Sequence, residues 1–468
     1  MSTDRPNILF IMSDDHASHA MSCYGSRINE TPNIDRIAQD GVRFENCFCT
    51  NSICTPSRAT ILAGTYNHVN RVTTLSTRMD NRLLTFPKLL RQAGYQTAVI
   101  GKWHLGEGKA HQPTGFDYWN VLSGQGLYHD PVMIEMGAEK TFHGYATDLI
   151  TDFSLRWLNE RDPARPFLLL CHHKAPHRAW EPDAKHATMY EELDIPEPET
   201  FDDDYSNRAR AAAEAKMRID RDLNEADLKQ PVPGGLTPQE EKHWRYERYI
   251  KDYLRCVASI DDNVGRLLDF LDAEGLAENS IVIYTSDQGF FLGDHGWYDK
   301  RFMYEESLRM PLLVRYPLEI TAGSANGDIV LNVDFAPTFL DLADVDVPDD
   351  MQGRSFRPLL SGGHVPDWQR GMYYRYWMHL AHHNVAAHYG MRTLRYKLIY
   401  YYGDACGQPG AVDDPREPEW ELFDLENDPH ELSNIYHDPG HAEVVKELRR
   451  DLRRLQEDVG DEPHETEA

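Results

Sequence analysis

The sequence predicts an α/β fold in which a large, mostly parallel sheet is sandwiched by helices. A smaller C-terminal α+β subdomain with an antiparallel sheet is expected to follow. Two observations lead to this prediction. Over residues 1–365, short apolar strands alternate with helical patterns, as in a parallel sheet covered on both faces. After about residue 365 the composition becomes aromatic and strand-like. We therefore expect a main domain over 1–365 and a subdomain over 366–468.

The elements of the main domain can be taken in chain order. "PNILFIMSDD" is predicted to be a buried strand, and so are "YQTAVIGKWH", "PFLLLC" and "SIVIYT". "TPNIDRIAQDG" predicts a helix with Thr31 as N-cap, Pro32 at the first helical position and Gly41 after its end. Further helices are expected for "FPKLLRQAG", for about 242–273 and for "DFAPTFLDLAD". "GRSFRPLLSG" is expected to be a loop with one short helical turn.

Two segments are set apart by composition. Residues 179–240 are polar, acidic and interrupted by prolines, which predicts a surface insertion and a candidate lid. In the subdomain, "GMYYRYWMH", "YGMRTLRYKLIYYYG" and "WELFDLENDP" are expected to be strands. "AEVVKELRRDLRRLQED" is expected to form the last helix.

Composition narrows the class of protein. The apolar runs are strand-length, well short of the roughly 20 residues of a membrane span. The first residues show neither a leader pattern nor a cleavage motif, which predicts a cytoplasmic protein with no membrane partner. The seven cysteines are scattered, so reduced thiols are expected.

The net charge of −28 disfavours nucleic acid as a partner. An anionic substrate would then have to be met by a local cluster of positive groups, because the field of the whole protein repels it.

Two strands end in similar oxygen-rich pairs. Asp14 and Asp15 follow "NILFIMS", and Asp287 and Gln288 follow "SIVIYTS". In open α/β sheets, ligands bind at the carboxyl ends of strands. Three carboxylates and an amide oxygen suit a hard cation, namely calcium, with magnesium as the alternative. The competing interpretation is that each Asp only caps the turn after its strand.

The stretch "NSICTPSRATILAG" places Cys54 just before a predicted helix with Pro56 in its first turn. A thiol at a helix N-terminus can be a thiolate nucleophile. It can equally be a small buried residue, the commonest fate of a free cysteine. Carboxylate sets for a hard cation fit poorly with thiol catalysis, since calcium does not bind sulfur.

"CTPSRATILAG" resembles the sulfatase signature Cys-x-Pro-Ser-Arg-x-x-x-Leu-x-Gly, with Ala63 where the family usually has Thr. Other similar motifs follow in the family's order: "PNILFIMSDDH", "GYQTAVIGKWHLG", "HHKAPH", "TSDQGFFLGDHGWYDK" and "ELFDLENDPHEL". The resemblance implies a sulfatase of the alkaline-phosphatase-like superfamily. It also implies that Cys54 is converted to formylglycine (3-oxoalanine) by a formylglycine-generating enzyme.

The resemblance implies a role for each matching residue. Asp14, Asp15, Asp287 and Gln288 would bind the calcium ion, together with the formylglycine at 54. The remaining catalytic positions are Arg58, Lys102, His104, His177 and Lys300. Arg58 would hold the formylglycine hydroxyl and Lys102 the sulfate, while His104 would take a proton. His177 and Lys300 would bind sulfate oxygens and the leaving alcohol. Lys102 and His104 are expected to alternate along a strand end and so to point into one site.

The chemistry that the resemblance implies explains why a thiol or serine would not suffice. One hydroxyl of the aldehyde hydrate attacks sulfur and displaces the alcohol. The other then loses its proton, and collapse to the aldehyde expels sulfate without a second attack at sulfur.

The substrate is the least determined feature. Around Lys300 and His177 the chain looks like the branch that contains N-acetylglucosamine-6-sulfatases, so a small sulfated sugar of that type is expected. Predicted substrate contacts are Lys174, His388 and Arg392, the last two from "HHNVAAHYGMRTLRYKLI". The alternatives are an aryl, alkyl or choline sulfatase and a phosphonate monoester or phosphodiester hydrolase of the same fold. A non-catalytic sugar-binding protein and a cysteine hydrolase are the more distant ones.

Overall fold

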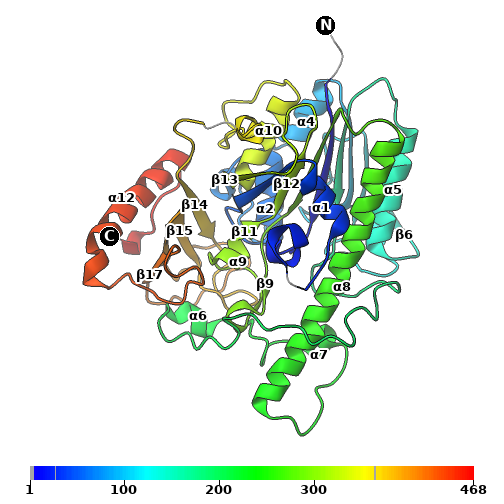
Figure 1. Ribbon diagram of the computed structural model, residues 1–468. Coiled ribbons are helices and arrows are strands. Elements are labelled where there is room, and N and C mark those ends of the chain that lie inside the picture. Colours follow the sequence, from blue (N-terminus) through cyan, green and yellow to red (C-terminus); the bar gives the residue numbers. More distant parts are fainter. Residues whose placement is uncertain (1–4, 27, 363–364, 468) are drawn as a thin grey trace.

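A computed structural model describes residues 5–26, 28–362 and 365–467 of the chain. Residues 1–4, on which the expectation of no leader partly depends, lie outside the described residues. Within the described residues, the centre of the molecule is an eleven-stranded sheet, and a four-stranded sheet with a long helix lies at its flank (Figure 1). No helix in this part of the chain combines the length and the apolar character that crossing a bilayer requires. The predicted α/β fold with a C-terminal antiparallel sheet is confirmed.

The middle of the large sheet is parallel. Its strands, in spatial order, are β8 (Ser280–Ser286), β1 (Asn7–Ser13), β7 (Phe167–His172), β3 (Gln96–Lys102) and β4 (Tyr118–Leu122). The first four of these are the strands that the apolar runs predicted. They are buried on both faces, which is why they read as continuous apolar runs rather than alternating patterns. Their carboxyl ends meet at one edge of the sheet.

Further strands extend the sheet on both sides and were not predicted. Beyond β8 come β12 (Leu312–Arg315), β2 (Val42–Phe48) and β11 (Arg309–Met310), with β13 (Ser324–Leu331) also paired to β2. Beyond β4 come β5 (Val132–Glu135) and β6 (Ala138–Thr141), both antiparallel. A two-stranded sheet, β9 (Phe291–Leu292) and β10 (Tyr298–Asp299), precedes Lys300.

Helices cover both faces of the large sheet. One layer contains α1 (Pro32–Gln39), α5 (Ala146–Glu160) and α8 (Pro238–Ala273). The other contains α2 (Cys54–Ala63), α4 (Phe86–Gln92) and α10 (Phe335–Leu342). Shorter helices are α3 (Asn67–Asn70), α6 (Arg210–Glu214), α7 (Glu225–Leu228), α9 (Glu305–Leu308) and α11 (Arg357–Leu360).

Two helix starts can be compared with their predictions. Thr31 does precede α1, but its hydroxyl donates to the Asp35 carboxylate instead of capping the helix backbone. Helix α8 begins at Pro238, four residues earlier than predicted. Thr237 and Glu240 form a capping box there, each side chain accepting a backbone N–H of the other residue.

The segment 179–240 is largely irregular; within the described residues its helices are α6, α7 and the first turn of α8. It nevertheless buries Phe201, Met217 and Ile219. Its Lys216 backbone N–H donates to the His383 carbonyl at 2.7 Å, and Arg218 forms a β-bridge with Trp297. These contacts make it part of the wall between α8 and the subdomain.

The subdomain is built as predicted. Strands β14 (Gly371–Tyr376), β15 (His388–Thr393), β16 (Tyr396–Tyr401) and β17 (Glu419–Asp424) form an antiparallel sheet, packed by α12 (Ala442–Val459). Figure 1 shows α12 on the side of the molecule opposite α5 and α8. Glu305 at the start of α9 joins the two parts through buried ion pairs with Arg392 and Lys397.

Candidate active site

The two oxygen-rich strand ends meet, as the sequence predicted. Strands β1 and β8 are neighbours, and Ser13 pairs with Ser286, so the next two residues of each chain segment lie side by side. The Asp15 backbone N–H donates to Asp287 Oδ1 at 3.2 Å, and Gln288 Nε2 donates to Asp15 Oδ1. All four side chains, those of Asp14, Asp15, Asp287 and Gln288, are fully buried.

Three buried carboxylates in one place strongly affect one another. Burial and repulsion from Asp14 raise the pKa of Asp287 to about 8, although Arg58 opposes the shift. Burial also raises the pKa of Asp15 to about 6 against the nearby Lys300. Burial would raise the pKa of Asp14 too, but Lys102, His177 and other cations outweigh it and hold that pKa well below its usual range. The cluster is therefore short of positive charge at Asp15 and Asp287.

Two acceptor atoms in this cluster are buried without a hydrogen-bond partner among the described residues. They are Asp14 Oδ1 and Gln288 Oε1. An unpaired buried acceptor is costly unless a cation or donor meets it. Oxygen-only donors of this kind are the ligands that calcium and magnesium use. The residues present therefore fit a hard divalent cation.

Cys54 is the first residue of α2 and is 1% exposed. Burial raises the pKa of its thiol to about 11, with Lys102 only partly offsetting the effect. A helix N-terminus was expected to favour a thiolate, but desolvation is the larger effect here. Cys54 is thus placed at the centre of the site as a neutral thiol, not as an ionised nucleophile.

Arg58, one helical turn after Cys54, donates hydrogen bonds to the ends of two strands, β8 and β3. Its Nε donates to Asp287 Oδ2 and its Nη1 to the Lys102 carbonyl, both at 2.8 Å. Its Nη2 lies 4.0 Å from Asp14 Oδ1. The guanidinium is therefore fixed on the carboxylate side of the cluster.

Lys102 and His104 both reach the site, but not by the predicted alternation. Strand β3 ends at Lys102, and His104 has a left-handed φ of 54°. Lys102 Nζ donates to the Asp14 carboxylate and, at 2.6 Å, to Gln125 Oε1. His104 Nδ1 lies 3.3 Å from Thr55 Oγ1. Burial lowers the pKa of His104 well below its usual value, and repulsion from the Lys102 charge is the second largest cause of the shift. The imidazole is therefore neutral.

The other predicted catalytic residues, Lys300 and His177, meet the cluster at Asp15. Lys300 Nζ donates to Asp15 Oδ2 at 2.6 Å, and His177 Nε2 lies 3.8 Å from the same oxygen. His177 Nδ1 is 2.7 Å from the Arg178 carbonyl, which leaves Nε2 facing the cluster. Lys174 is buried over the Tyr128 ring, and burial, then repulsion from Lys102, lowers its pKa to about 8.

Sequence reasoning missed three polar residues beside this cluster, Gln125, Asp299 and Arg301, and it preferred His388 to His383 within the same stretch. Gln125, in a Gly-Gln-Gly turn, binds Lys102. Asp299 and Arg301 flank Lys300. Asp299 accepts from Arg301 Nε, and its Oδ2 lies 3.2 Å from His383 Nε2. The Arg301 guanidinium is close enough to position 54 to interact with a negative charge that forms there. The left-handed φ angles of Asp299 and Arg301, 79° and 95°, are a signal of a constrained functional turn that the sequence does not show.

Two predicted substrate contacts are corrected by the structure. His388 is buried in an aromatic stack with Tyr374 and Tyr376, and its Nδ1 is bound to the Ala386 carbonyl. Arg392 pairs with Glu305 through two hydrogen bonds and covers the Phe48 ring. Among the described residues, neither side chain contacts a member of the cluster. Both lie on β15, where Arg392 packs against the main domain at Glu305 and Phe48 and His388 packs among aromatic rings.

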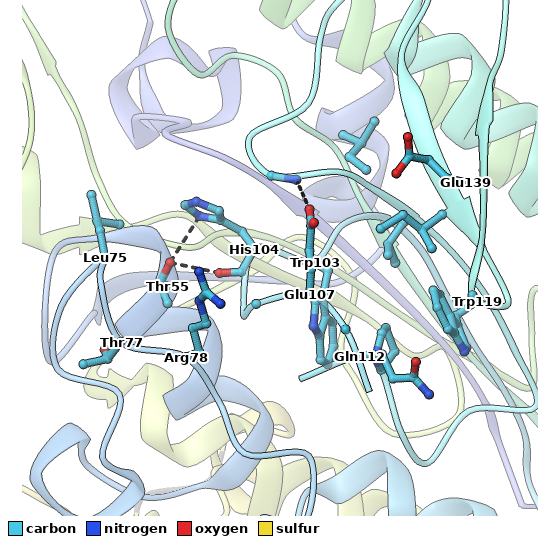
Figure 2. A pocket seen from close by; sticks show the side chains of 18 residues that line it. Thr55, Leu75, Thr77, Arg78, Trp103, His104, Glu107, Gln112, Trp119 and Glu139 are labelled. Carbon is cyan, nitrogen blue, oxygen red and sulfur yellow. Dashed lines mark hydrogen bonds between the residues drawn. The ribbon is translucent and has the colours of Figure 1, made fainter. Parts of the chain in front are cut away.

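A cavity of about 600 Å³ borders the site at Thr55 and His104 (Figure 2). Trp103, Trp119 and Arg78 also line it, whereas Cys54 does not. The cavity therefore lies beside the cluster rather than over the Cys54 sulfur.

Comparison with known protein families shows which family the chain belongs to. The model of the family described as "Sulfatase" matches residues 6–345. The chain belongs to the sulfatase family. A second family model, "N-sulphoglucosamine sulphohydrolase, C-terminal", matches residues 293–458 of this sulfatase.

Several relatives of this sulfatase cover nearly its whole length. It is 44% identical to an N-acetylglucosamine-6-O-sulfatase of Bacteroides thetaiotaomicron, over 100% of this chain and 89% of that one. An arylsulfatase of Clostridium perfringens is 28% identical over 96% of this chain and 94% of its own.

Solved structures give the same picture. The structure of BT4656 in complex with its substrate D-glucosamine-2-N,6-O-disulfate superposes with a TM-score of 0.92 at 43% identity, covering 97% of this chain and 98% of that one. The phosphonate monoester hydrolase of Agrobacterium radiobacter, with a TM-score of 0.74, shares 21% identity over 97% and 96% of the two chains. That likeness shows a common fold and no more.

Proposed function

We propose that this sulfatase releases inorganic sulfate from a small sulfated glucosamine by cleaving the ester at the 6-position. One observation carries the proposal. Cys54, the residue of the family signature, lies buried at the start of α2 with Arg58, Lys102 and Lys300 around it. In a chain of net charge −28, this local group of cations is what an anionic substrate requires.

The proposal includes the conversion of Cys54 to formylglycine by a formylglycine-generating enzyme. The hydrated aldehyde supplies a hydroxyl nucleophile and a second hydroxyl for the release of sulfate. A neutral thiol with a pKa near 11 would be a poor nucleophile at neutral pH, which is consistent with a precursor role.

A calcium ion, with magnesium as the alternative, would be held by Asp14, Asp15, Asp287 and Gln288. Bound there, it supplies Lewis-acid stabilisation of developing negative charge. The unpaired Asp14 Oδ1 and Gln288 Oε1 support this assignment.

The remaining side chains have roles that follow from their positions. Lys102 and Lys300 orient the sulfate oxygens and stabilise negative charge that builds up on them. His104 is neutral and has Nδ1 against Thr55, so Nε2 accepts a proton. His177, also neutral because burial lowers its pKa, presents Nε2 beside Asp15, where the leaving oxygen would lie.

The preference for a sulfated glucosamine is supported by the relatives and by the wall beside Cys54. This wall contains a carboxylate, a guanidinium and an imidazole. The Asp299 carboxylate lies 3.1 Å from Arg301 Nε and 3.2 Å from His383 Nε2. Such a set can bind sugar hydroxyls through both donors and acceptors. Lys174, near Lys102 and Asp14, is a further candidate for the substrate's anionic group.

The test begins with protein co-expressed with a formylglycine-generating enzyme. The mass of the Cys54 peptide should show the aldehyde or its hydrate. Sulfate release is then measured on N-acetylglucosamine-6-sulfate, a nitrophenyl sulfate, choline sulfate and a phenylphosphonate ester, with and without a chelator.

We expect the amino sugar to give the highest kcat/KM and the chelator to abolish turnover. A dominant rate on the aryl or choline ester would replace the substrate assignment, and the 28% identity to an arylsulfatase makes that the second candidate. A dominant phosphonate rate, or an unmodified and active thiol, would overturn the proposal.

A further inference from the structure

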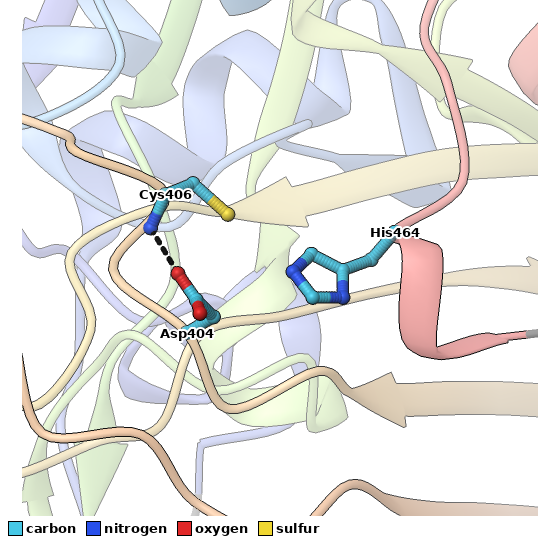
Figure 3. A group of neighbouring side chains, drawn as sticks. All are labelled: Asp404, Cys406 and His464. Atoms are coloured by element: carbon cyan, nitrogen blue, oxygen red, sulfur yellow. Dashed lines mark hydrogen bonds between the residues drawn. The ribbon is translucent and has the colours of Figure 1, made fainter.

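Three side chains with metal-binding atoms meet in the subdomain, away from the sulfatase site. Asp404 and Cys406 lie in the loop after β16, and His464 lies in the tail after α12. The carboxylate oxygen, the sulfur and an imidazole nitrogen all lie within 4.8 Å of one another. Figure 3 shows the Cys406 sulfur and the His464 ring facing one another, with the Asp404 carboxylate beside the Cys406 backbone nitrogen.

The orientation of His464 is fixed by its surroundings. Its Nδ1 lies 2.7 Å from Thr466 Oγ1, and its ring stacks on Tyr402 with centroids 5.0 Å apart. Its backbone N–H donates to Tyr389 Oη at 3.0 Å. With Nδ1 held by Thr466, the nitrogen directed at Asp404 and Cys406 in Figure 3 is Nε2. Nδ1 also accepts the Thr466 backbone N–H at 3.3 Å, so Nε2 of the neutral ring carries the proton, and a cation that binds Nε2 would displace that proton.

The loop side of the cluster is equally constrained. The Cys406 backbone N–H donates to Asp404 Oδ1 at 2.5 Å, and Cys406 itself has a left-handed φ of 47°. This tight turn brings the sulfur and the carboxylate to the same side of the loop. Cys406 is partly exposed, so a water molecule can reach the cluster.

We propose that Asp404, Cys406 and His464 form a binding site for a thiophilic divalent cation, with zinc as the best match. A thiolate, an imidazole and a carboxylate are ligands that zinc combines, whereas calcium and magnesium take oxygen alone. Zinc–ligand bonds of about 2.0–2.3 Å put tetrahedral ligands about 3.3–3.8 Å apart. Side-chain rotations that move the ligand atoms by about 1 Å would bring them to this spacing. A water molecule would be the fourth ligand.

The charge of the site is compatible with a cation. Arg375 approaches Cys406, but its Nη1 is bound at 2.9 Å by both oxygens of Asp461. Metal binding takes the cysteine as thiolate and releases the thiol proton to solvent. The thiolate and Asp404 then balance the two charges of the cation.

The site would join the loop after β16 to the C-terminal tail. The tail is otherwise held by hydrogen bonds such as those of Asp461 to Arg375 and of Thr466 to Tyr400. A bound cation would add a link between segments almost 60 positions apart in the chain, and should stabilise the folded subdomain.

The test uses the full chain in excess calcium, which occupies the oxygen-only site, and titrates it with cobalt(II) as a spectroscopic probe. We expect one equivalent of cobalt to produce a thiolate-to-cobalt charge-transfer absorption with tetrahedral d–d bands, and zinc to displace it. Cys406→Ser should lose the charge-transfer band, and His464→Asn should weaken binding at least tenfold. Cys23→Ser is the matched control, because Cys23 is also partly exposed and adjoins a carboxylate, Asp35, and it should keep the band.

Zinc should also raise the Tm of the native chain and leave that of Cys406→Ser unchanged. Both site variants should keep sulfate release, which shows that they are folded, because neither residue belongs to the sulfatase cluster. Absence of a thiolate band in the native chain would overturn the proposal. So would a band that survives in Cys406→Ser or moves with Cys23→Ser.

Discussion

Lys102 is held between a charged and a neutral partner, the Asp14 carboxylate and Gln125 Oε1. Removing Gln125 leaves the ammonium free to turn fully toward Asp14 and away from a substrate oxygen. We expect Gln125→Ala to lower kcat by about 10- to 100-fold, as a displacement of about 1 Å can do, with a smaller change in KM. Steady-state kinetics on N-acetylglucosamine-6-sulfate measures it.

Gln112→Ala provides the control for Gln125→Ala, since Gln112 lines only the neighbouring cavity. Its kcat should stay within about twofold of the native value. Equal losses in the two variants would mean that Gln125 has no particular role in positioning Lys102.

His388 makes a prediction about acid stability. Burial lowers its pKa to about 4, below the 6.5 of an exposed histidine. Between pH 4 and pH 6.5 the unfolded chain binds a proton at position 388 that the folded chain does not. The stability contributed by the neutral, buried His388 is therefore fully present above pH 6.5 and is lost as the pH falls toward 4. His388→Phe removes it. Relative to the variant, the native chain should lose about 3 kcal/mol of unfolding free energy between pH 7 and pH 4.

Urea unfolding at a series of pH values measures the effect of His388→Phe. Between pH 7 and pH 8.5 the difference between the two proteins should stay constant. Parallel curves down to pH 4 would show that the His388 pKa is not lowered by burial.

At the scale of elements, β3 and β7 approach closely at Gly101. This residue has a φ of 106°, and a Cβ added there would lie 1.9 Å from the His172 carbonyl oxygen. Gly101→Ala must separate two central strands next to Lys102. We expect a loss of about 3 kcal/mol or more in unfolding free energy, together with lost activity. Chemical denaturation and sulfate release measure these effects.

Gly94→Ala separates backbone strain from collision. Gly94 has a similar φ of 100°, but no atom lies within 4 Å of the added Cβ. It should cost only about 1 kcal/mol and leave activity intact. If Gly101→Ala costs no more than Gly94→Ala, the strands are not in close contact there.

The elements that the sequence revealed are those with a strong local signal. β1, β7 and β8 are continuous apolar runs because helices cover both of their faces. β6 escaped notice because all four of its residues are exposed, so no apolar pattern marks it. Lys102 and His104 were placed correctly for an incorrect reason, since β3 ends before His104 and a left-handed residue brings it back.

The same reasoning explains the errors at the site. Asp14, Asp287 and Cys54 were found because each follows a recognisable strand or helix start. Arg301 was missed, and His388 was preferred to His383, because only the fold brings the turn after β10 and the subdomain together. Arg392 was predicted to bind substrate because several polar residues lie close together in its stretch of sequence. In the fold its guanidinium pairs with the buried Glu305 carboxylate.

At the scale of the whole molecule, the main domain and subdomain are joined through buried charges. Glu305 of α9 pairs with Arg392, Lys397 and Arg309, and Lys397 also pairs with Glu431. Arg392→Met leaves Glu305 with less compensation in a buried setting. We expect a loss of about 3 kcal/mol in stability, with KM unchanged at a temperature where the variant is folded. Thermal unfolding and kinetics on the same sample measure both.

Arg395→Met is the matched control for Arg392→Met. Arg395 lies three positions later and forms a salt bridge with Asp424 at the surface, so its loss should have only a small effect on Tm. A raised KM in Arg392→Met without a loss of stability would return Arg392 to the substrate-binding role first predicted for it.

The burial of α2 has a consequence for the history of each molecule. All ten residues of the helix are buried, and Cys54 is among the most enclosed of them. An enzyme that alters this side chain must therefore reach it before the helix docks, while the chain is still being made or is not yet folded. If Cys54 is converted to formylglycine as proposed, the modified fraction would be set by the relative rates of folding and modification. A chain that folds first would then stay inactive however much modifying enzyme is added later.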